Sequence, residues 1–492
     1  MPLILPGNVA TELAGASYSI DKSCRFDGSN DYLTITFSGS PTSNQKGTVS
    51  YWTKRSGLGA SMFSGLVAVE TGVSSYGTNF NAADNLDFWF YYPGSGDDYE
   101  GELKTNAKFR DVSAWFHVVF SWDTTQSTNT NRLKLYINGV NQKDAGGYAT
   151  ETYPNQNQAV HWGQTGTAHR IGANPETANN KWNGYMAEVV YIDGIQYAAS
   201  DFGEFDSDSP TIWKPKDVSG LNFTGNNSFH LDFEDSSDLG NDVSGNNNDF
   251  AATGTAAVDQ SSDSPTNNFC TLNNIATTGS IGDDLTFGEG NCRITNTSSG
   301  AWHPAIGTIA AKAGKWYAEF KVNTLGSASK YAILDPEQYT ESVNFAAADR
   351  GYSYEYNAGA AVNDGNFTDN WGDTFTTNDI ISVAMDLDNM HLYFAKNGTW
   401  QDSGDPTSGA TGTGTHPYFG GGSNTARAAG TDYYAFATNI HNNSVTDANF
   451  GGCPAFAISS AAADANGYGT FEYAPPSGFY ALCTKNLAEF GG

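Results

Sequence analysis

The chain has 492 residues, with 53 acidic residues against 24 basic ones and a formal net charge of −29. This balance argues against nucleic acid and anionic membranes as partners, because both need clustered Lys and Arg. The length exceeds what one hydrophobic core usually organises, so we expect two or more domains.

The composition is typical of β-strands joined by many turns. The chain contains 55 Gly, 29 Phe, 26 Tyr and 11 Trp residues, whereas helix-forming stretches are scarce. Only residues 306–314 and 461–466 have a helical pattern, of one or two turns each. The sequence therefore predicts an all-β fold, with two antiparallel β-sandwich (jelly-roll) domains in series joined by an Asp/Asn/Gly-rich connector.

The first sandwich is organised around a hairpin. Residues 115–122 (WFHVVFSW) form a strand that needs burial on both faces, and an Asp/Thr/Asn-rich turn follows it. Residues 132–137 (RLKLYI) then alternate apolar and polar side chains and end at Asn138-Gly139, which predicts a second strand closed by a tight turn. His117, inside the first strand, is expected to be a core or edge residue and not a catalytic base.

The second sandwich repeats this arrangement. Residues 380–387 (IISVAMDL) lead into a turn, and residues 391–395 (HLYFA) run to Asn397-Gly398. Two hairpins this far apart in the sequence cannot share a small core. We therefore predict five parts in chain order: an N-terminal arm (1–20), a first sandwich (21–200), a connector with one or two strands (201–270), a second sandwich (271–476) and a C-terminal tail (477–492).

The N-terminal arm carries no export signal. It begins MPLILPGNVATELAG without a basic start, and Pro2 and Pro6 interrupt its apolar run. No stretch of the chain approaches the length of a membrane span, so we expect synthesis in a cytoplasm without a signal peptide. The apolar segment at residues 3–5 (LIL) has no core of its own, which predicts a homo-oligomer, with a trimer favoured.

The five cysteines are Cys24, Cys270, Cys292, Cys453 and Cys483. They lie far apart, their number is odd, and no CxxC or Cys/His metal spacing is present. We expect buried free thiols and no disulfide framework.

Part of the chain resembles the laminin-G-like, concanavalin-like jelly-roll family. The segments that carry this likeness are, in order, FDGSNDYLTI, GTVSYWTK, WFHVVFSWD with LKLYINGV, RIGA and WNGYMAEVVYIDG. The resemblance implies two antiparallel sheets and binding of glycans or proteins, in some relatives with calcium. Other relatives hydrolyse glycans with three carboxylates spaced Glu-x-Asp-x-x-Glu, which this chain lacks; Glu204-Phe205-Asp206 has only two. We expect no enzymatic activity.

The second half resembles a SPRY domain. GKWYAEF, GDTFTTNDIISVAMDLDNMHLYFAKNG and YYAFA occur in the order typical of that family, whereas residues 327–348 depart from its pattern. The resemblance implies a sandwich that binds proteins or has a structural role, without catalytic residues.

The whole arrangement is similar to a virion protein of marine bacteriophages, described as tail-fibre-like or tail-associated. The connector landmarks WKP, LGNDVSGNNND and DSPTNNF and the ending PPSGFYAL carry this likeness. It implies a location on the particle surface, tail or fibre, with other virion proteins and a host surface glycan or protein as partners. The alternatives are a capsid-surface decoration or purely architectural protein, a glycan-degrading depolymerase and a bacterial lectin-like adhesin.

Candidate binding residues are exposed aromatic and acidic side chains, which can stack on sugar rings and accept sugar hydroxyls. The competing interpretation is an ordinary hairpin tip for the first group and core packing for the second. The first group is Tyr91, Tyr92, Asp97, Asp98 and Tyr99, and the second is Trp371, Trp400 and Tyr418.

No cofactor is expected to be required, and calcium is the one candidate cation. Asp238, Asp242 and Asp249 of the connector offer hard oxygen ligands, but without EF-hand spacing. Solvated turns are the competing interpretation.

Overall fold

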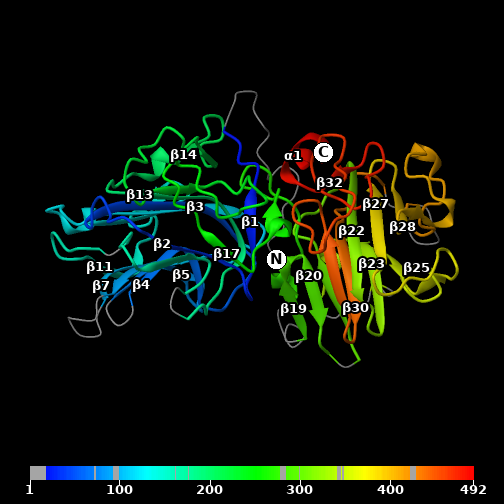
Figure 1. Ribbon diagram of the computed structural model, residues 1–492. Helices are drawn as coiled ribbons and strands as arrows, with labels where there is room; N and C mark the ends of the chain where they lie inside the picture. The colour runs from blue at the N-terminus through cyan, green and yellow to red at the C-terminus, as the bar shows by residue number, and fades with distance from the viewer. Residues whose placement is uncertain are drawn as a thin grey trace. The chain divides into compact units, whose positions relative to one another are not determined.

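The computed structural model divides into two compact units, one ending at Thr266 and one beginning at Asn267 (Figure 1). Strands make up 41% of the chain and helices 7%, which confirms the predicted all-β class. The structure describes residues 18–70, 74–91, 99–160, 162–174, 177–277, 284–298, 300–340, 345, 348–420 and 428–491.

The N-terminal unit is a sandwich of two eight-stranded sheets. The first sheet has the order β10-β9-β8-β3-β13-β1-β18, with β16 paired to β13 beside β1. Its strands are β1 (Ser23–Asp27), β3 (Lys46–Arg55), β8 (Trp115–Asp123), β9 (Leu133–Ile137), β10 (Val140–Asn141), β13 (Asn183–Asp193), β16 (Phe229–Leu231) and β18 (Gln260–Ser261).

The second sheet has the order β11-β7-β6-β5-β4-β12-β2-β17, and β14 and β15 form a separate pair. These strands are β2 (Tyr32–Thr36), β4 (Met62–Glu70), β5 (Ser74–Phe80), β6 (Asn85–Tyr91), β7 (Tyr99–Lys108), β11 (Tyr148–Thr152), β12 (Ala168–Ile171), β14 (Gly203–Phe205), β15 (Trp213–Pro215) and β17 (Ala251–Thr253).

The C-terminal unit is a second sandwich. One sheet has the order β19-β20-β31-β22-β27-β28-β29, with β32 paired to β22, and the other has the order β21-β30-β23-β24-β25-β26. The strands are β19 (Leu285–Gly288), β20 (Arg293–Asn296), β21 (Trp302–Ile306), β22 (Lys315–Thr324), β23 (Ala328–Leu334), β24 (Gly351–Glu355), β25 (Ala360–Asn363), β26 (Asn366–Thr368), β27 (Ile380–Asp386), β28 (His391–Lys396), β29 (Thr399–Trp400), β30 (Ala435–His441), β31 (Val445–Asn449) and β32 (Tyr480–Ala481).

Among the described residues helix is confined to short segments, and the two stretches with a helical pattern in the sequence are not among them: the expectation for 306–314 and 461–466 was wrong. The first stretch begins at Ile306, the last residue of the buried strand β21. The helical segments are α1 (Thr484–Phe490) and the 3-10 turns η1 (Asn129–Asn131), η2 (Ala199–Asp201), η3 (Ala257–Asp259), η4 (Asn274–Thr277), η5 (Glu289–Asn291), η6 (Pro336–Gln338), η7 (Gln401–Ser403) and η8 (Gly409–Thr411).

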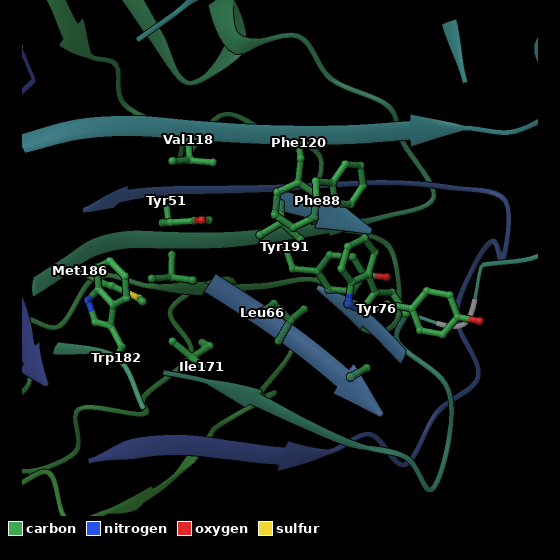
Figure 2. Close-up of a cluster of buried hydrophobic side chains, with 14 of the residues drawn as sticks. Tyr51, Leu66, Tyr76, Phe88, Val118, Phe120, Ile171, Trp182, Met186 and Tyr191 are labelled. Atoms are coloured by element: carbon green, nitrogen blue, oxygen red, sulfur yellow. The ribbon is translucent and has the colours of Figure 1, made fainter. Parts of the chain in front are cut away.

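Each sandwich has its own core of large side chains. In the N-terminal unit, alternate residues of β8 and of β6 point inward, and Phe120 and Phe88 meet there with ring centroids 4.6 Å apart (Figure 2). The C-terminal unit buries Trp316, Phe320 and Phe436 in a separate cluster. Burying each such ring stabilises the fold by about 1.5–3 kcal/mol. A separate core in each unit agrees with the expectation of two or more domains that was made from the chain length.

The two hairpins predicted from the sequence are confirmed. β8 pairs with β9 and β27 with β28, both antiparallel. Asn138-Gly139 and Asn397-Gly398 both adopt positive φ, which is the backbone conformation that a two-residue hairpin turn requires.

The connector folds onto the N-terminal unit. The connector, expected to hold one or two strands, contributes β16, which pairs with β13, and β17 and β18, which pair with β2 and β1. Residues 199–218 cover the outer face of the first sheet, where Phe202 and Val218 pack with Val190 and Ile192. This face is therefore occupied by the chain itself.

All five cysteines are buried and free, as expected. None of the described helices is long and apolar enough to cross a membrane.

Candidate functional site

The hairpin of β6 and β7 bears the aromatic and acidic loop singled out in the sequence. The strands end at Tyr91 and Tyr99, which pair with each other in the register. Residues 92–98, with Tyr92, Asp97 and Asp98, lie outside the described residues, and so do the side chains of Tyr91 and Tyr99. What the structure describes is the stem that carries this loop.

The stem presents a polar and aromatic face away from the core. Phe88 and Phe90 point into the sandwich, so Asp87 and Trp89, which alternate with them along β6, point outward. Asp87 lies opposite Lys104, and Trp89 lies opposite Glu102. Directly paired residues share a face, so these four side chains form one outward patch, which we call the stem patch.

Charges in the stem patch are partly compensated. Lys104 Nζ lies 2.8 Å from Glu102 Oε1. Burial raises the pKa of Asp87 to about 6, against the opposing effect of Lys104. Asp87 Oδ2 accepts a hydrogen bond from Asn81 Nδ2 at 3.2 Å, whereas its buried Oδ1 has no partner. The patch therefore offers carboxylate acceptors with one cation beside them.

Aromatic and small residues flank Trp89. Its ring centroid lies 5.8 Å from that of Phe63 on β4, and Gly77 on β5 occupies the position directly opposite it. Further along the same sheet, the Arg170 guanidinium lies 4.5 Å from the centroid of the Tyr32 ring. A partly buried indole beside hydroxyl-accepting carboxylates offers groups that can bind the apolar face and the rim of a sugar ring.

Residues 85–91 (NLDFWFY) carry the two-residue alternation of a strand with one buried face. The signal was present, because Asp87 and Trp89 alternate with Phe88 and Phe90. Placing Glu102 and Lys104 beside them requires the β6–β7 register. The sequence alone does not define this register, because it does not show where each strand ends.

A buried Ser50–His117 pair superficially resembles a nucleophile with its base. Ser50 Oγ lies 2.8 Å from His117 Nε2, and Trp213 Nε1 donates to His117 Nδ1 at 3.1 Å. An indole N–H can only donate, so Nδ1 carries the lone pair and Nε2 carries the proton. His117 cannot then accept the Ser50 proton, and burial further lowers its pKa to about 3. The pair is a structural contact, in line with the core role expected for His117.

A second buried pair joins the connector to the first sheet. His230 Nε2 lies 2.6 Å from Glu188 Oε2, and Tyr18 donates to Glu188 Oε1 at 3.1 Å. Burial alone would lower the pKa of His230, but the Glu188 carboxylate outweighs it and raises the pKa. Glu188 adopts a positive φ at a bulge in β13. A cavity of about 10 Å³ beside it has room for about one water molecule.

The three connector carboxylates proposed for a cation bond to their own loops. Asp238 accepts from the amide of Gly240, and Asp249 from the amide of Asp242. Asp242 itself accepts from the amides of His230 and Asn248. In the part of the chain that the structure describes, no three His, Cys, Asp or Glu side chains gather as a metal site would need. Calcium binding stays a prediction.

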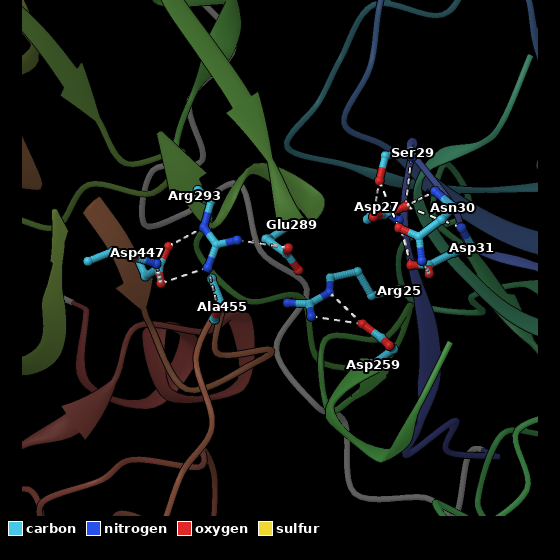
Figure 3. A network of polar contacts seen from close by, with 11 residues as sticks. Arg25, Asp27, Ser29, Asn30, Asp31, Asp259, Glu289, Arg293, Asp447 and Ala455 are labelled. Atoms are coloured by element: carbon cyan, nitrogen blue, oxygen red, sulfur yellow. Dashed lines mark hydrogen bonds and ion pairs between the residues drawn. The ribbon is translucent and has the colours of Figure 1, made fainter. Parts of the chain in front are cut away.

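Other acidic residues cap turns in the same way (Figure 3). In the FDGSND segment, Asp27 Oδ1 accepts from the amides of Ser29, Asn30 and Asp31. Burial, together with the nearby Asp27 and Asp259, raises the pKa of Asp31 to about 7. In the C-terminal unit, the Arg293 guanidinium binds both oxygens of Asp447, at 2.5 and 2.8 Å.

The aromatic candidates of the C-terminal unit lie in two places. Trp371 is 7% exposed and packs against His416, which Tyr418 also contacts, with ring centroids 5.7 and 5.8 Å away. Trp400 packs elsewhere, against Tyr393. Tyr418 is half-buried, and its hydroxyl lies 2.9 Å from Thr368 Oγ1. The core covers most of the Trp371 ring, and ligand binding by these three residues stays a prediction.

Residues 27–201 match the family model Laminin_G_3, the concanavalin A-like lectin/glucanases superfamily. The matched segment is the sandwich whose stem patch is described above. No curated protein matches the sequence.

Three similar solved structures are a SPRY domain, a pentraxin and a proposed carbohydrate-binding protein. The SPRY domain of human HERC1 is 12% identical, with a TM-score of 0.25 over 34% of this chain and 89% of that chain. A SAP-like pentraxin of Limulus polyphemus is 14% identical, with a TM-score of 0.27 over 37% of this chain and 80% of that one. A proposed carbohydrate-binding protein of Bacteroides ovatus is 12% identical, with a TM-score of 0.30 over 49% of this chain and 61% of that chain. The family match is the comparison that bears on function.

Proposed function

We propose that the protein is a non-catalytic binding protein that recognises glycan through the stem patch of β6 and β7. The observation that carries the proposal is the outward pairing of Trp89 with Glu102 and of Asp87 with Lys104, in a segment matched by the lectin/glucanase superfamily model. Trp89 supplies a stacking surface, and the carboxylates accept sugar hydroxyls. The strongly negative chain favours neutral over anionic glycans.

We further propose that the protein acts on the surface of a bacteriophage particle, as a tail-fibre-like or tail-associated component that binds host glycan. The support is the sequence likeness carried by the connector landmarks and by the ending PPSGFYAL. Other virion proteins are its assembly partners in this proposal, and the N-terminal arm serves as the attachment segment of a homo-oligomer.

Binding to immobilised neutral polysaccharides, namely β-glucan, α-mannan and galactan, tests the glycan proposal. Trp89→Ala should weaken the binding of the recognised polysaccharide at the stem patch by at least about tenfold, because the stacking surface is lost. Phe205→Ala is the matched control, since Phe205 is also an exposed aromatic residue of the N-terminal unit but lies on the separate β14–β15 pair. Equal affinity of Trp89→Ala and the wild type, or no binding to any of these polysaccharides, contradicts the proposal.

Adsorption of particles to host cells tests the particle proposal. Replacing Tyr92, Asp97, Asp98 and Tyr99 by Ala should weaken adsorption while leaving assembly and Tm unchanged, because residues 92–98 connect β6 to β7 in the sequence and Tyr99 is the first residue of β7. Particles that fail to assemble while adsorption per particle is unchanged would assign an architectural role instead. Shortened polysaccharide chains after incubation with the protein would assign a depolymerase.

A further inference from the structure

The two sandwiches have the same strand topology. In the N-terminal unit, β10-β9-β8-β3-β13-β1 lie in one sheet and β7-β6-β5-β4-β12-β2 in the other. In the C-terminal unit, β29-β28-β27-β22-β31-β20 and β26-β25-β24-β23-β30-β21 lie in the corresponding order. Each strand from β1 to β10 thus corresponds to the strand at the same step from β20 to β29, and β12 and β13 correspond to β30 and β31. Of the core strands, β11 alone lacks a described counterpart.

The turns that follow β9 and β28 match in detail. Asn138 donates its amide to the His117 carbonyl and accepts from the His117 amide through Oδ1, at 2.9 and 2.8 Å. Asn397 makes the same two bonds with Ile380, both at 2.8 Å. The glycine that follows each Asn has a φ of +79°.

A covering aromatic side chain approaches each of these turn glycines. A Cβ at Gly139 would lie 2.2 Å from the Trp213 ring, and a Cβ at Gly398 would lie 2.7 Å from the Tyr473 ring. In each unit, therefore, an aromatic residue from the segment that follows the sandwich seals the same turn. Agreement in topology, turn geometry and sealing residue indicates one module used twice.

We infer that the C-terminal sandwich is a second copy of the same binding module and carries its own glycan-binding face on β25 and β26, centred on Phe367. The inference rests on the proposed function of the stem patch, because β25 and β26 are the counterparts of β6 and β7. The family match covers residues 27–201 alone, so nothing in it assigns a site to this second sandwich.

Phe367 has the properties that such a face requires. Phe367 lies directly opposite Val362, which is buried with Ala360 in a small cluster apart from the main core that holds Ala361. It is 51% exposed, the largest fraction among the described large hydrophobic residues. Asp364 and Asp369 on either side of it in the chain are exposed. An exposed phenyl ring with two exposed carboxylates close to it in the sequence offers the same types of group as Trp89 with Asp87 and Glu102, so the expected ligand is again a neutral glycan.

The stoichiometry of binding to the full chain tests the inference. The probe is a soluble hexasaccharide of whichever polysaccharide the protein binds, titrated by isothermal calorimetry. Wild type should bind two molecules per chain. Phe367→Ser and Trp89→Ala should each bind one, the double variant none, and Phe367→Tyr two, because its ring is kept. Unchanged Tm and near-ultraviolet circular dichroism establish that the variants are folded, which the exposure of Phe367 favours.

The outcomes separate the two proposals. One molecule bound per wild-type chain, lost in Trp89→Ala and kept in Phe367→Ser, overturns the second face but not the first. Full binding in Trp89→Ala together with loss in Phe367→Ser overturns the stem patch and leaves the C-terminal face as the site. Two molecules bound by Phe367→Ser overturn the inference.

Discussion

Glu319 on β22 offers a sharp test of the energetics of the C-terminal unit. It is fully buried, and its carboxyl group accepts hydrogen bonds from the amides of Glu472 and Tyr473, from the Tyr317 hydroxyl and from Asn449 Nδ2, at 2.8–3.0 Å. These bonds hold the C-terminal segment against the sheet. Burial raises the pKa of Glu319 to about 7, above its usual 4.5.

The sign of the pH effect follows from this raised pKa. Between pH 4.5 and pH 7 the folded state keeps a proton that the unfolded state has lost, so the stability of the unit falls as pH rises through this window. One pKa unit corresponds to about 1.4 kcal/mol, so the loss is about 3 kcal/mol in all. Above pH 7 the contribution of Glu319 is constant.

Glu319→Gln cannot titrate, and it turns an amide NH2 toward two groups that also donate. We expect it to destabilise the unit by about 2–4 kcal/mol at pH 4.5, because buried donors lose their acceptor. The difference in the free energy of unfolding between this variant and the wild type should narrow as pH rises to 8. Calorimetry of the full chain measures the stability of the two proteins at each pH. Hydrogen exchange of residues 315–324 and 468–482 identifies the transition that belongs to the C-terminal unit. A difference in the free energy of unfolding that stays constant from pH 4.5 to pH 8 would refute the reasoning.

Three further outcomes test other parts of the structure. Lys54→Met removes the cation 2.8 Å from buried Asp263 and should cost about 3–5 kcal/mol in urea denaturation, and a loss below about 1 kcal/mol would contradict this. Dithiothreitol should leave Tm unchanged because all cysteines are free, so a fall of several degrees would reveal a disulfide. Gly398→Ala should lower Tm more than Gly365→Ala. Both strain a positive φ by about 1–2 kcal/mol, but only Gly398 faces a ring, that of Tyr473, and equal losses would count against that contact.

Local features of the fold could be predicted from the sequence. Two-residue alternation and Asn-Gly turns predict the hairpins at 115–137 and 380–396. The geometry of these turns depends on a few neighbouring residues. The free cysteines followed from their spacing alone.

Features that depend on distant partners could not be predicted. The outer face of the first sheet is apolar at Val190 and Ile192, but nothing in the sequence says that residues 199–218 cover it. The bulge at Glu188 lies between the residues of β13 that pair with β1 and those that pair with β16, two segments far apart in the chain. The stem patch belongs to the same class, since its four residues meet only through the β6–β7 register.

The two halves of the chain resembled different families in sequence, yet they share one topology, and the physical reason lies in what each level of structure constrains. Strand order is set by which strands bury their apolar faces together and by tight turns such as Asn138-Gly139 and Asn397-Gly398, which need few specified residues. Side chains in turns, loops and outward positions can change without disturbing the core. Trp89 and Phe367 are such outward positions, so two copies of one sandwich can keep their strand order while their binding faces diverge.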